Sequence, residues 1–259
     1  MTTPAPTAPA ILVTGGAKRI GSDICRKFGQ AGWHVIIHYG TSQREAEALA
    51  ASLPSAEILQ CDLADAMAAA AMVQALAERH ADWRVLVNNA SVFQHDSVQA
   101  MDSSVFAEAM SINAQTPALL TQAFLAHART AGGRRVIQIL DQKLDNPNPD
   151  FFSYTMSKHA LAATVPMLAI ALQNTQDRIY GLCPGAILPS HDQTADEAAR
   201  SHKLNLLGRQ TGPDEIAEAA LFMAQGWLAS GEMIFVDSGQ HLLAQPRDVI
   251  YLERESAPA

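Results

Sequence analysis

The sequence predicts an α/β fold in which a doubly wound parallel sheet of about seven strands forms a single domain. Short apolar runs alternate with helical patterns along nearly the whole chain. The first run, residues 10–13, leads through a glycine-containing turn into a helix, which is how a dinucleotide-binding unit begins. With 259 residues, 48% of them hydrophobic, the chain can fill one core of this kind.

Composition excludes several classes of protein. The net charge of −8 argues against a nucleic-acid surface. The three cysteines, Cys25, Cys61 and Cys183, lack metal-ligand spacing and indicate buried thiols in a reducing cytoplasm, and the nine histidines form no recognisable metal site. Residues 1–9 lack the features of a signal peptide and read as a disordered lead-in, and the apolar segment 160–172 is too short to span a membrane. We expect a soluble, cytoplasmic protein without a metal.

The expected elements follow in order and fill a domain over residues 10–243. Buried apolar runs with turn residues behind them predict strands at residues 10–13, 34–39, 56–63, 84–91, 134–140, 177–185 and 232–239. Helical periodicity and propensity predict helices at residues 20–31, 42–53, 65–80, 105–131 and 214–226, and a further one around Tyr154, kinked at Pro166. Residues 186–211 look like a variable loop over the site.

The first turn has the sequence TGGAKRIG, from Thr14 to Gly21. Glycines there allow a tight turn and let a pyrophosphate approach the backbone at the N-terminus of the next helix. We therefore expect this turn to bind a dinucleotide through its residues Gly15, Lys18, Arg19, Ile20 and Gly21.

The end of the second strand suggests which dinucleotide is bound. An acid that takes the ribose hydroxyls usually stands there, but this strand ends in His38 and Tyr39, and the first acid is Glu45, inside the next helix. Lys18 and Arg19 supply donors for a 2′-phosphate, unless both are merely solvated. The sequence favours NADP(H), with contacts also from His38, Tyr39 and Ser42.

Later strand ends carry further candidates, because the carboxyl ends of parallel strands meet at one edge of the sheet. Asp62, followed by Leu63, either contacts the adenine or organises a turn. The two amides Asn88 and Asn89 either tie neighbouring loops together or touch the cofactor. We expect cofactor contacts from Asp62, Leu63, Asn89, Ala90, Ser91, Pro184 and Gly185.

Tyr154 and Lys158 stand four residues apart in a predicted helix, so both side chains lie on one face, one turn apart. A free phenol has a pKa of ~10, and a neighbouring ammonium favours the phenolate and lowers that pKa. Such a pair suits adding or removing a proton while a hydride moves. The alternative is an amphipathic helix that carries the two residues by chance.

Taken together, these motifs resemble the short-chain dehydrogenase/reductase family over nearly the whole chain. The resemblance rests on the glycine turn, Asp62, Asn88-Asn89-Ala90, Asn113, the Tyr154–Lys158 pair and Pro184-Gly185, in that order. It implies that Tyr154 donates the proton, that Lys158 lowers the pKa of Tyr154 and holds the nicotinamide ribose, and that Asn113 supports a water relay. It also implies a homotetramer, formed through the helix face with Ala160, Ala163 and Met167.

Two departures from the family pattern narrow the resemblance. Arg19 stands where the family turn usually has glycine, and Asp141 stands where a serine usually precedes the tyrosine. Both are similar to the pteridine reductase and dihydromonapterin reductase branch, in which the phenylalanine matching Phe93 stacks a pterin ring. Thr41, where related reductases have an arginine, and Ser238, in place of a glycine, depart from that branch.

The chemistry of Asp141 supports the same reading. An ionised carboxylate only accepts hydrogen bonds and repels a developing alkoxide, so it suits a ring with N–H groups better than a ketone. We predict reduction of 7,8-dihydromonapterin or dihydrobiopterin to the tetrahydro form, with Asp141, Tyr154, Lys158 and Asn113 as the catalytic set and Phe93 holding the substrate. The alternatives are a carbonyl or 3-oxoacyl reductase, or a non-catalytic NADP-binding sensor.

Residues 244–259 form a C-terminal tail. Its apolar cluster, residues 249–252, suggests packing on a neighbouring subunit near the site.

Overall fold

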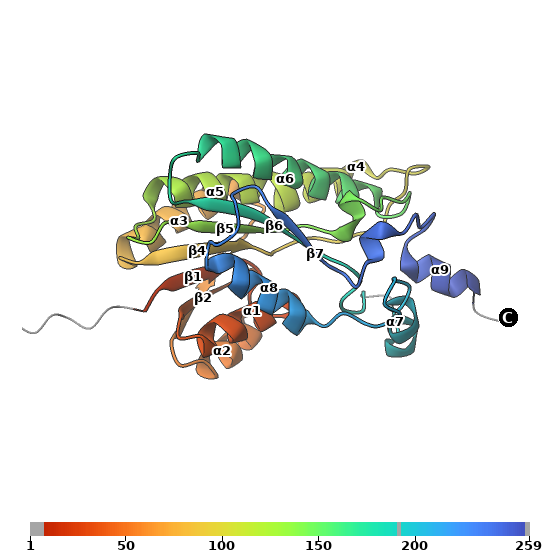
Figure 1. The fold of residues 1–259 in the computed structure, drawn as a ribbon, viewed down its shortest axis with the longest axis horizontal. Helices are drawn as coiled ribbons and strands as arrows, with labels where there is room; N and C mark the ends of the chain where they lie inside the picture. The colour runs from red at the N-terminus through yellow and green to blue at the C-terminus, as the bar shows by residue number, and fades with distance from the viewer. Residues whose placement is uncertain (1–7, 191–192, 257–259) are drawn as a thin grey trace, which may run out of the picture.

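The computed structural model describes residues 8–190 and 193–256, so most of the predicted lead-in lies outside the described residues. Seven parallel strands form one sheet in the order β3-β2-β1-β4-β5-β6-β7 (Figure 1). This confirms the predicted doubly wound α/β fold. The strands are β1 (Ala10–Val13), β2 (His34–Tyr39), β3 (Ala56–Gln60), β4 (Trp83–Asn88), β5 (Arg135–Ile139), β6 (Arg178–Pro184) and β7 (Met233–Val236).

The centre of the sheet is apolar on both faces, which is what a parallel sheet covered by helices requires. Leu12 of β1 pairs with Ile36 of β2 on one side and Leu86 of β4 on the other, and all three side chains are fully buried. The strand order reverses between β1 and β4. In such sheets the crevice at the carboxyl ends of these strands is where ligands bind.

Helices cover both faces (Figure 1). One layer contains α1 (Arg19–Gln30), α2 (Gln43–Ala51) and α8 (Pro213–Ala224). The other contains α3 (Ala66–Arg79), α4 (Ser103–Met110), α5 (Thr116–His127) and α6 (Phe152–Ala171). Each layer closes its own hydrophobic core cluster against the sheet.

One helix differs from the prediction. The single helix expected at residues 105–131 is α4, a π-helical turn η1 (Ser111–Gln115) and α5. Pro117 lies in the first turn of α5, where its missing N–H costs little. Pro166, where we predicted a kink, lies inside α6, which continues as one helix to Ala171.

The segment expected as a loop over residues 186–211 contains α7 (Ala195–Ser201), which begins with a capping box between Thr194 and Glu197. Short 3₁₀ turns η2 (Gln142–Leu144) and η3 (Gln240–Leu242) follow β5 and β7. The tail ends in α9 (Val249–Ser256), which lies beside α7 (Figure 1). Within residues 8–190 and 193–256, none of the helices has the length and apolarity needed to cross a bilayer.

Candidate active site

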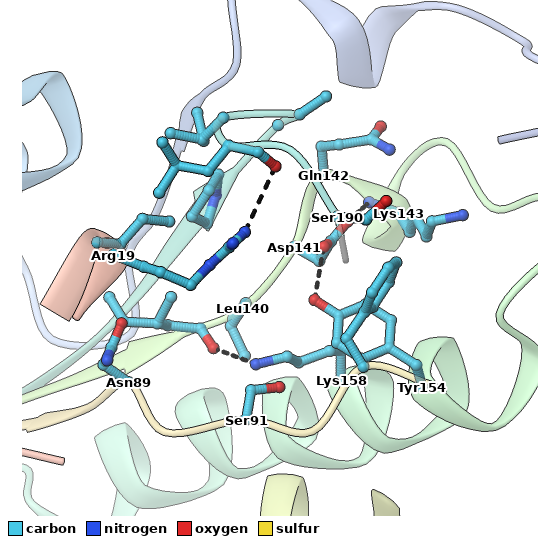
Figure 2. A pocket seen from close by; sticks show the side chains of 18 of the residues that line it. Arg19, Asn89, Ser91, Leu140, Asp141, Gln142, Lys143, Tyr154, Lys158 and Ser190 are labelled. Atoms are coloured by element: carbon cyan, nitrogen blue, oxygen red, sulfur yellow. Dashed lines mark hydrogen bonds between the residues drawn. The ribbon is translucent and has the colours of Figure 1, made fainter. Parts of the chain in front are cut away.

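A cavity of about 520 Å³ lies at the carboxyl ends of the central strands, at the point where the strand order reverses (Figure 2). It runs from the glycine turn before α1 to the start of α6, and the tail closes its far end. Of the predicted site residues, it is lined by Gly15, Lys18, Arg19, Ile20, Gly21, Asn89, Ala90, Ser91, Phe93, Asp141, Tyr154, Lys158, Pro184 and Gly185.

The glycine turn is packed too closely for side chains. A Cβ added to Gly21 would lie 2.4 Å from the carbonyl oxygen of Gly15, and Gly15 itself has a φ of +60°. The backbone is therefore bare at the N-terminus of α1, where phosphates are favoured. This cradle fits the pyrophosphate of a dinucleotide.

His38 of β2 is hydrogen-bonded to the glycine turn. Its Nδ1 accepts a hydrogen bond from the backbone N–H of Gly15 at 3.1 Å, so Nε2 carries the ring proton and faces the carbonyl oxygen of Cys61 at 3.1 Å. Burial lowers the pKa of His38 to about 4, which keeps the ring neutral. We predicted a direct cofactor contact, but His38 is buried and holds the turn in shape.

Asn89 fastens the same turn from β4. Its Nδ2 donates to the carbonyl oxygens of Thr14 at 2.8 Å and Gly15 at 3.2 Å. Asn88 points the other way and donates to Gln138 and Thr121 under α5. Both amides tie neighbouring segments together, and only Asn89 also faces the cavity.

Four other predicted cofactor ligands lie outside the cavity lining. Tyr39 and Leu63 are buried in the two core clusters. Asp62 is exposed and accepts from the backbone N–H of Ala64 at 2.9 Å, so it organises a turn. Ser42 precedes α2 without capping it through its side chain. The ends of β2 and β3 therefore lie beyond the cavity rather than in its wall.

Arg19 and Lys18, the two cations predicted to bind a 2′-phosphate, each contact a protein group. Arg19, whose φ is 52°, extends its guanidinium to donate to the carbonyl oxygens of Pro189 at 2.9 Å and Leu188 at 3.4 Å. Lys18 pairs with Glu45 at 2.8 Å, both half-exposed. We expected no carboxylate here, and Glu45 corrects this because the first turn of α2 faces the glycine turn.

Asp141 and Tyr154 form the centre of the site. The Tyr154 hydroxyl donates to Oδ2 of Asp141 at 2.7 Å, and Oδ1 accepts from the backbone N–H of Lys143 at 2.9 Å (Figure 2). Burial raises the pKa of Asp141, and burial together with the Asp141 charge raises the pKa of Tyr154 well above 10. The predicted lowering of the Tyr154 pKa is therefore wrong in direction, because burial and, after it, the neighbouring carboxylate disfavour the phenolate.

Lys158 lies one turn further along α6. Its Nζ donates to the carbonyl oxygen of Ile139 at 2.8 Å and stands 5.6 Å from the centre of the Tyr154 ring. Burial lowers the pKa of Lys158 to about 8. The lysine thus points into the cavity between β5 and the glycine turn, within the part suited to a dinucleotide.

Asn113 lies in the π-helical turn η1 and is fully buried. Its carboxamide pairs with both backbone groups of Val92, accepting from N at 2.8 Å and donating to O at 2.9 Å. Its Nδ2 also donates to Ser157 Oγ at 3.0 Å. Asn113 therefore joins the loop after β4 to α6. Its partner on α6, Ser157, directly precedes Lys158 in the chain.

Aromatic rings gather beside Tyr154 at one end of the cavity. Phe93 stacks on Phe151, with ring centres 4.1 Å apart and planes 21° apart, and meets Tyr154 edge-on at 4.7 Å. Ile250 and Tyr251 of the tail pack against the same cluster. Phe93 lines the cavity as predicted, with one of its faces covered by Phe151.

The tail forms part of the cavity wall of its own chain, which sequence reasoning missed. Val249 and Ile250 line the cavity of their own chain, where we had expected packing on a neighbouring subunit. A buried ion pair holds them there, with Lys143 Nζ 2.8 Å from Asp248 Oδ2. The neighbouring Arg247 pairs with Asp150 at 2.8 Å. The apolar run that follows Asp248 was the available signal in the sequence. No local pattern identified Lys143 as the partner of Asp248.

Known proteins resemble this chain over most of its length. A family model described as enoyl-(acyl carrier protein) reductase matches residues 15–241. The crystal structure of FolM alternative dihydrofolate reductase 1 from Brucella suis in complex with NADP has a TM-score of 0.85 and 33% identity, covering 91% of this chain and 96% of that one.

Two further relatives have different activities in their names. Pteridine reductase 1 of Leishmania tarentolae is 30% identical over a matched length of 285 residues including gaps, and the match covers 93% of this chain and 99% of that protein. The angucycline C-6 ketoreductase LanV with bound NADP has a TM-score of 0.80 and 25% identity, covering 91% of this chain and 96% of its own. On the matched family model and these relatives, the chain belongs to the short-chain dehydrogenase/reductase family.

Proposed function

We propose that this protein is an NADPH-dependent reductase of a dihydropterin, with 7,8-dihydromonapterin or dihydrobiopterin reduced to the tetrahydro form. The observation that carries the proposal is the hydrogen bond from Tyr154 to Asp141, which puts a carboxylate beside the proton donor. The names of the Brucella and Leishmania relatives support a substrate of the pterin or folate class.

The cofactor part rests on the shape of the cavity. The bare backbone around Gly15 and Gly21 leads directly toward Lys158 and Tyr154, so a dinucleotide on the turn brings its nicotinamide to the phenol. Arg19 is the cation placed to meet a 2′-phosphate, and two solved relatives contain NADP. When bound, the reduced dinucleotide supplies the hydride.

The side chains divide the remaining work. Asp141 accepts hydrogen bonds from ring or amino N–H groups and so orients the heterocycle. As a C–H bond forms at the carbon of the C=N group, the Tyr154 hydroxyl supplies the proton to the nitrogen. Phe93 contacts the planar ring, and Val249 and Ile250 exclude water from the far side.

The competing reading is a carbonyl or 3-oxoacyl reductase. It is favoured by the likeness to an angucycline ketoreductase. Such a reaction develops negative charge on a carbonyl oxygen, and an ionised Asp141 beside Tyr154 opposes that charge. A protonated Asp141 removes this objection, so only turnover separates the two readings.

The test is a comparison of NADPH oxidation with dihydromonapterin, dihydrobiopterin, dihydrofolate, small ketones and a 3-oxoacyl thioester. We expect kcat/KM to be highest for a dihydropterin by at least tenfold. Ketone or thioester turnover without dihydropterin turnover contradicts the proposal. NADH, run alongside NADPH, tests the cofactor part separately.

We also propose that the protein is a homotetramer that associates through α6. Met167 and Ile170 are 62% and 69% exposed on the outer face of that helix, which is unusual for large apolar side chains. Light scattering after size exclusion measures the assembly. A monomeric protein, or a Met167→Glu variant with unchanged mass, contradicts this assignment.

A further inference from the structure

A second cluster of ligating side chains lies at the opposite edge of the sheet from the cavity. His34 is the first residue of β2, Glu57 is near the start of β3, and His80 directly follows α3. The cavity occupies the carboxyl ends of the strands, whereas these residues stand at their amino ends. None of them lines the cavity.

The fold explains why these residues meet. Glu57 pairs in register with Ile36, which places its side chain on the same face as Ile36 and, two residues earlier, His34. This is the face covered by α3, because Ile36 belongs to the core cluster that contains Val73 and Leu76 of that helix. Because α3 covers this face and ends at Arg79, the next residue, His80, lies beside His34 and Glu57.

The geometry is that of a three-ligand group. One ligating atom from each residue lies within 4.8 Å of the others, and His80 Nε2 is 2.8 Å from Glu57 Oε1. The rings of His34 and His80 are 5.2 Å apart. All three side chains are partly buried, so packing against the sheet and α3 fixes their relative positions.

His34 supplies the observation that points to a ligand. Its Nε2 is shielded from solvent and has no hydrogen-bond partner among residues 8–190 and 193–256. Its Nδ1 lies 2.7 Å from Ser55 Oγ. When Nδ1–H donates to that hydroxyl, a lone pair remains on Nε2, as in metal-bound histidines oriented by a second group.

We propose that His34, Glu57 and His80 bind a divalent transition-metal ion of the Zn²⁺ type. Two imidazoles and one carboxylate are a recognised ligand set for zinc, with water at the fourth position. The ion takes the place of the proton between His80 Nε2 and Glu57, and that proton leaves to solvent. The C-terminal end of α3 adds a partial negative charge nearby.

Arg79 is the competitor at this site. It donates to both oxygens of Glu57, at 3.1 and 3.2 Å. An ionised carboxylate has about four lone-pair positions, so Arg79 and an ion can share it. The ion joins β2, the edge strand β3 and α3 into one unit, and its role is to stabilise that edge without taking part in turnover. This inference revises our expectation of no metal, which relied on local spacing.

The test uses full-length protein without a histidine tag, stripped with chelator and titrated with Zn²⁺ by calorimetry. We expect one site per chain, a higher Tm with Zn²⁺ and no binding of Mg²⁺. His34→Gln and His80→Gln should each weaken Zn²⁺ binding at least tenfold. The control His127→Gln, an exposed histidine on α5, should bind as the wild type does.

Cobalt separates a structural defect from loss of a ligand. Bound Co²⁺ in a four-coordinate site should give visible absorption bands that disappear in His80→Gln, while NADPH oxidation by that variant continues. Binding by the histidine variants at wild-type affinity, or no stoichiometric Zn²⁺ binding by the native chain, overturns the proposal.

Discussion

The Tyr154 hydroxyl donates to Oδ2 of Asp141 at 2.7 Å, and this contact sets the protonation of the site. Burial raises the pKa of both groups, and the Asp141 charge raises that of Tyr154 further, whereas the hydrogen bond from Tyr154 favours the ionised form of Asp141. The phenol therefore keeps its proton at neutral pH. It is available as a donor, and the carboxylate holds it in place.

Asp141→Ser should change substrate preference. The serine removes the acceptor for N–H groups and restores a donor for a carbonyl oxygen. We expect kcat/KM for dihydropterins to fall about 100-fold, the lower end of general acid–base effects, and ketone turnover to rise. Steady-state kinetics on both substrate classes measures this, with NADPH affinity as the control. Unchanged dihydropterin turnover contradicts the role given to Asp141.

The ion pair between Lys143 and Asp248 should hold the tail over the cavity. Both side chains are nearly fully buried, so Asp248→Asn leaves a buried charge and should cost about 3–5 kcal/mol of unfolding free energy. Because Val249 and Ile250 follow directly, the substrate KM should also rise. Lys143→Met combined with Asp248→Asn should recover part of the stability. Urea unfolding and kinetics measure both effects.

The matched control is an exposed pair. Arg26 and Asp23 lie 3.2 Å apart on α1, both partly exposed, and Arg26→Gln should cost less than about 1 kcal/mol of unfolding free energy. If Asp248→Asn costs no more than this control, the tail is not held by its ion pair.

The fold and much of the cavity lining could be predicted because both depend on local patterns. Buried runs predicted every strand, and residues at their carboxyl ends meet by topology, as Asn89 and Gly185 do. What could not be predicted depends on contacts between distant segments. The partner of Asp248 and the buried position of His38 under Gly15 are set by packing, which no spacing in the sequence encodes.

Arg19→Gly should weaken the binding of NADPH much more than that of NADH. Arg19 has a φ of 52°, so glycine relieves backbone strain and the fold should be as stable or up to about 1 kcal/mol more stable. Loss of the guanidinium removes charge-assisted hydrogen bonds to a 2′-phosphate, so NADPH should bind about 10- to 100-fold more weakly. NADH affinity should hardly change. Fluorescence titration of both nucleotides decides this, and an equal loss for both contradicts it.

His38 should make the protein sensitive to acid. Its pKa is about 4 in the folded state against 6.5 for an ordinary histidine, so the unfolded chain binds the proton first as pH falls. Stability should therefore drop between pH 6.5 and 4 by about 3 kcal/mol from this residue. His38→Gln should remove that part of the slope in chemical unfolding. Identical slopes in both proteins contradict the burial argument.

Lys158 should produce the alkaline limb of the pH profile. Its pKa is about 8, so the ammonium that faces the dinucleotide part of the cavity is lost as pH rises through this value. Tyr154 is not the source of this limb, because burial and the Asp141 charge raise its pKa well above 10. We expect kcat/KM for NADPH to fall about tenfold per pH unit above 8 where the charge is essential. Lys158→Arg keeps its charge at high pH and should lose the limb, whatever its absolute rate. A native profile that stays flat to pH 9.5, with circular dichroism unchanged, shows that the charge of Lys158 does not assist binding or turnover.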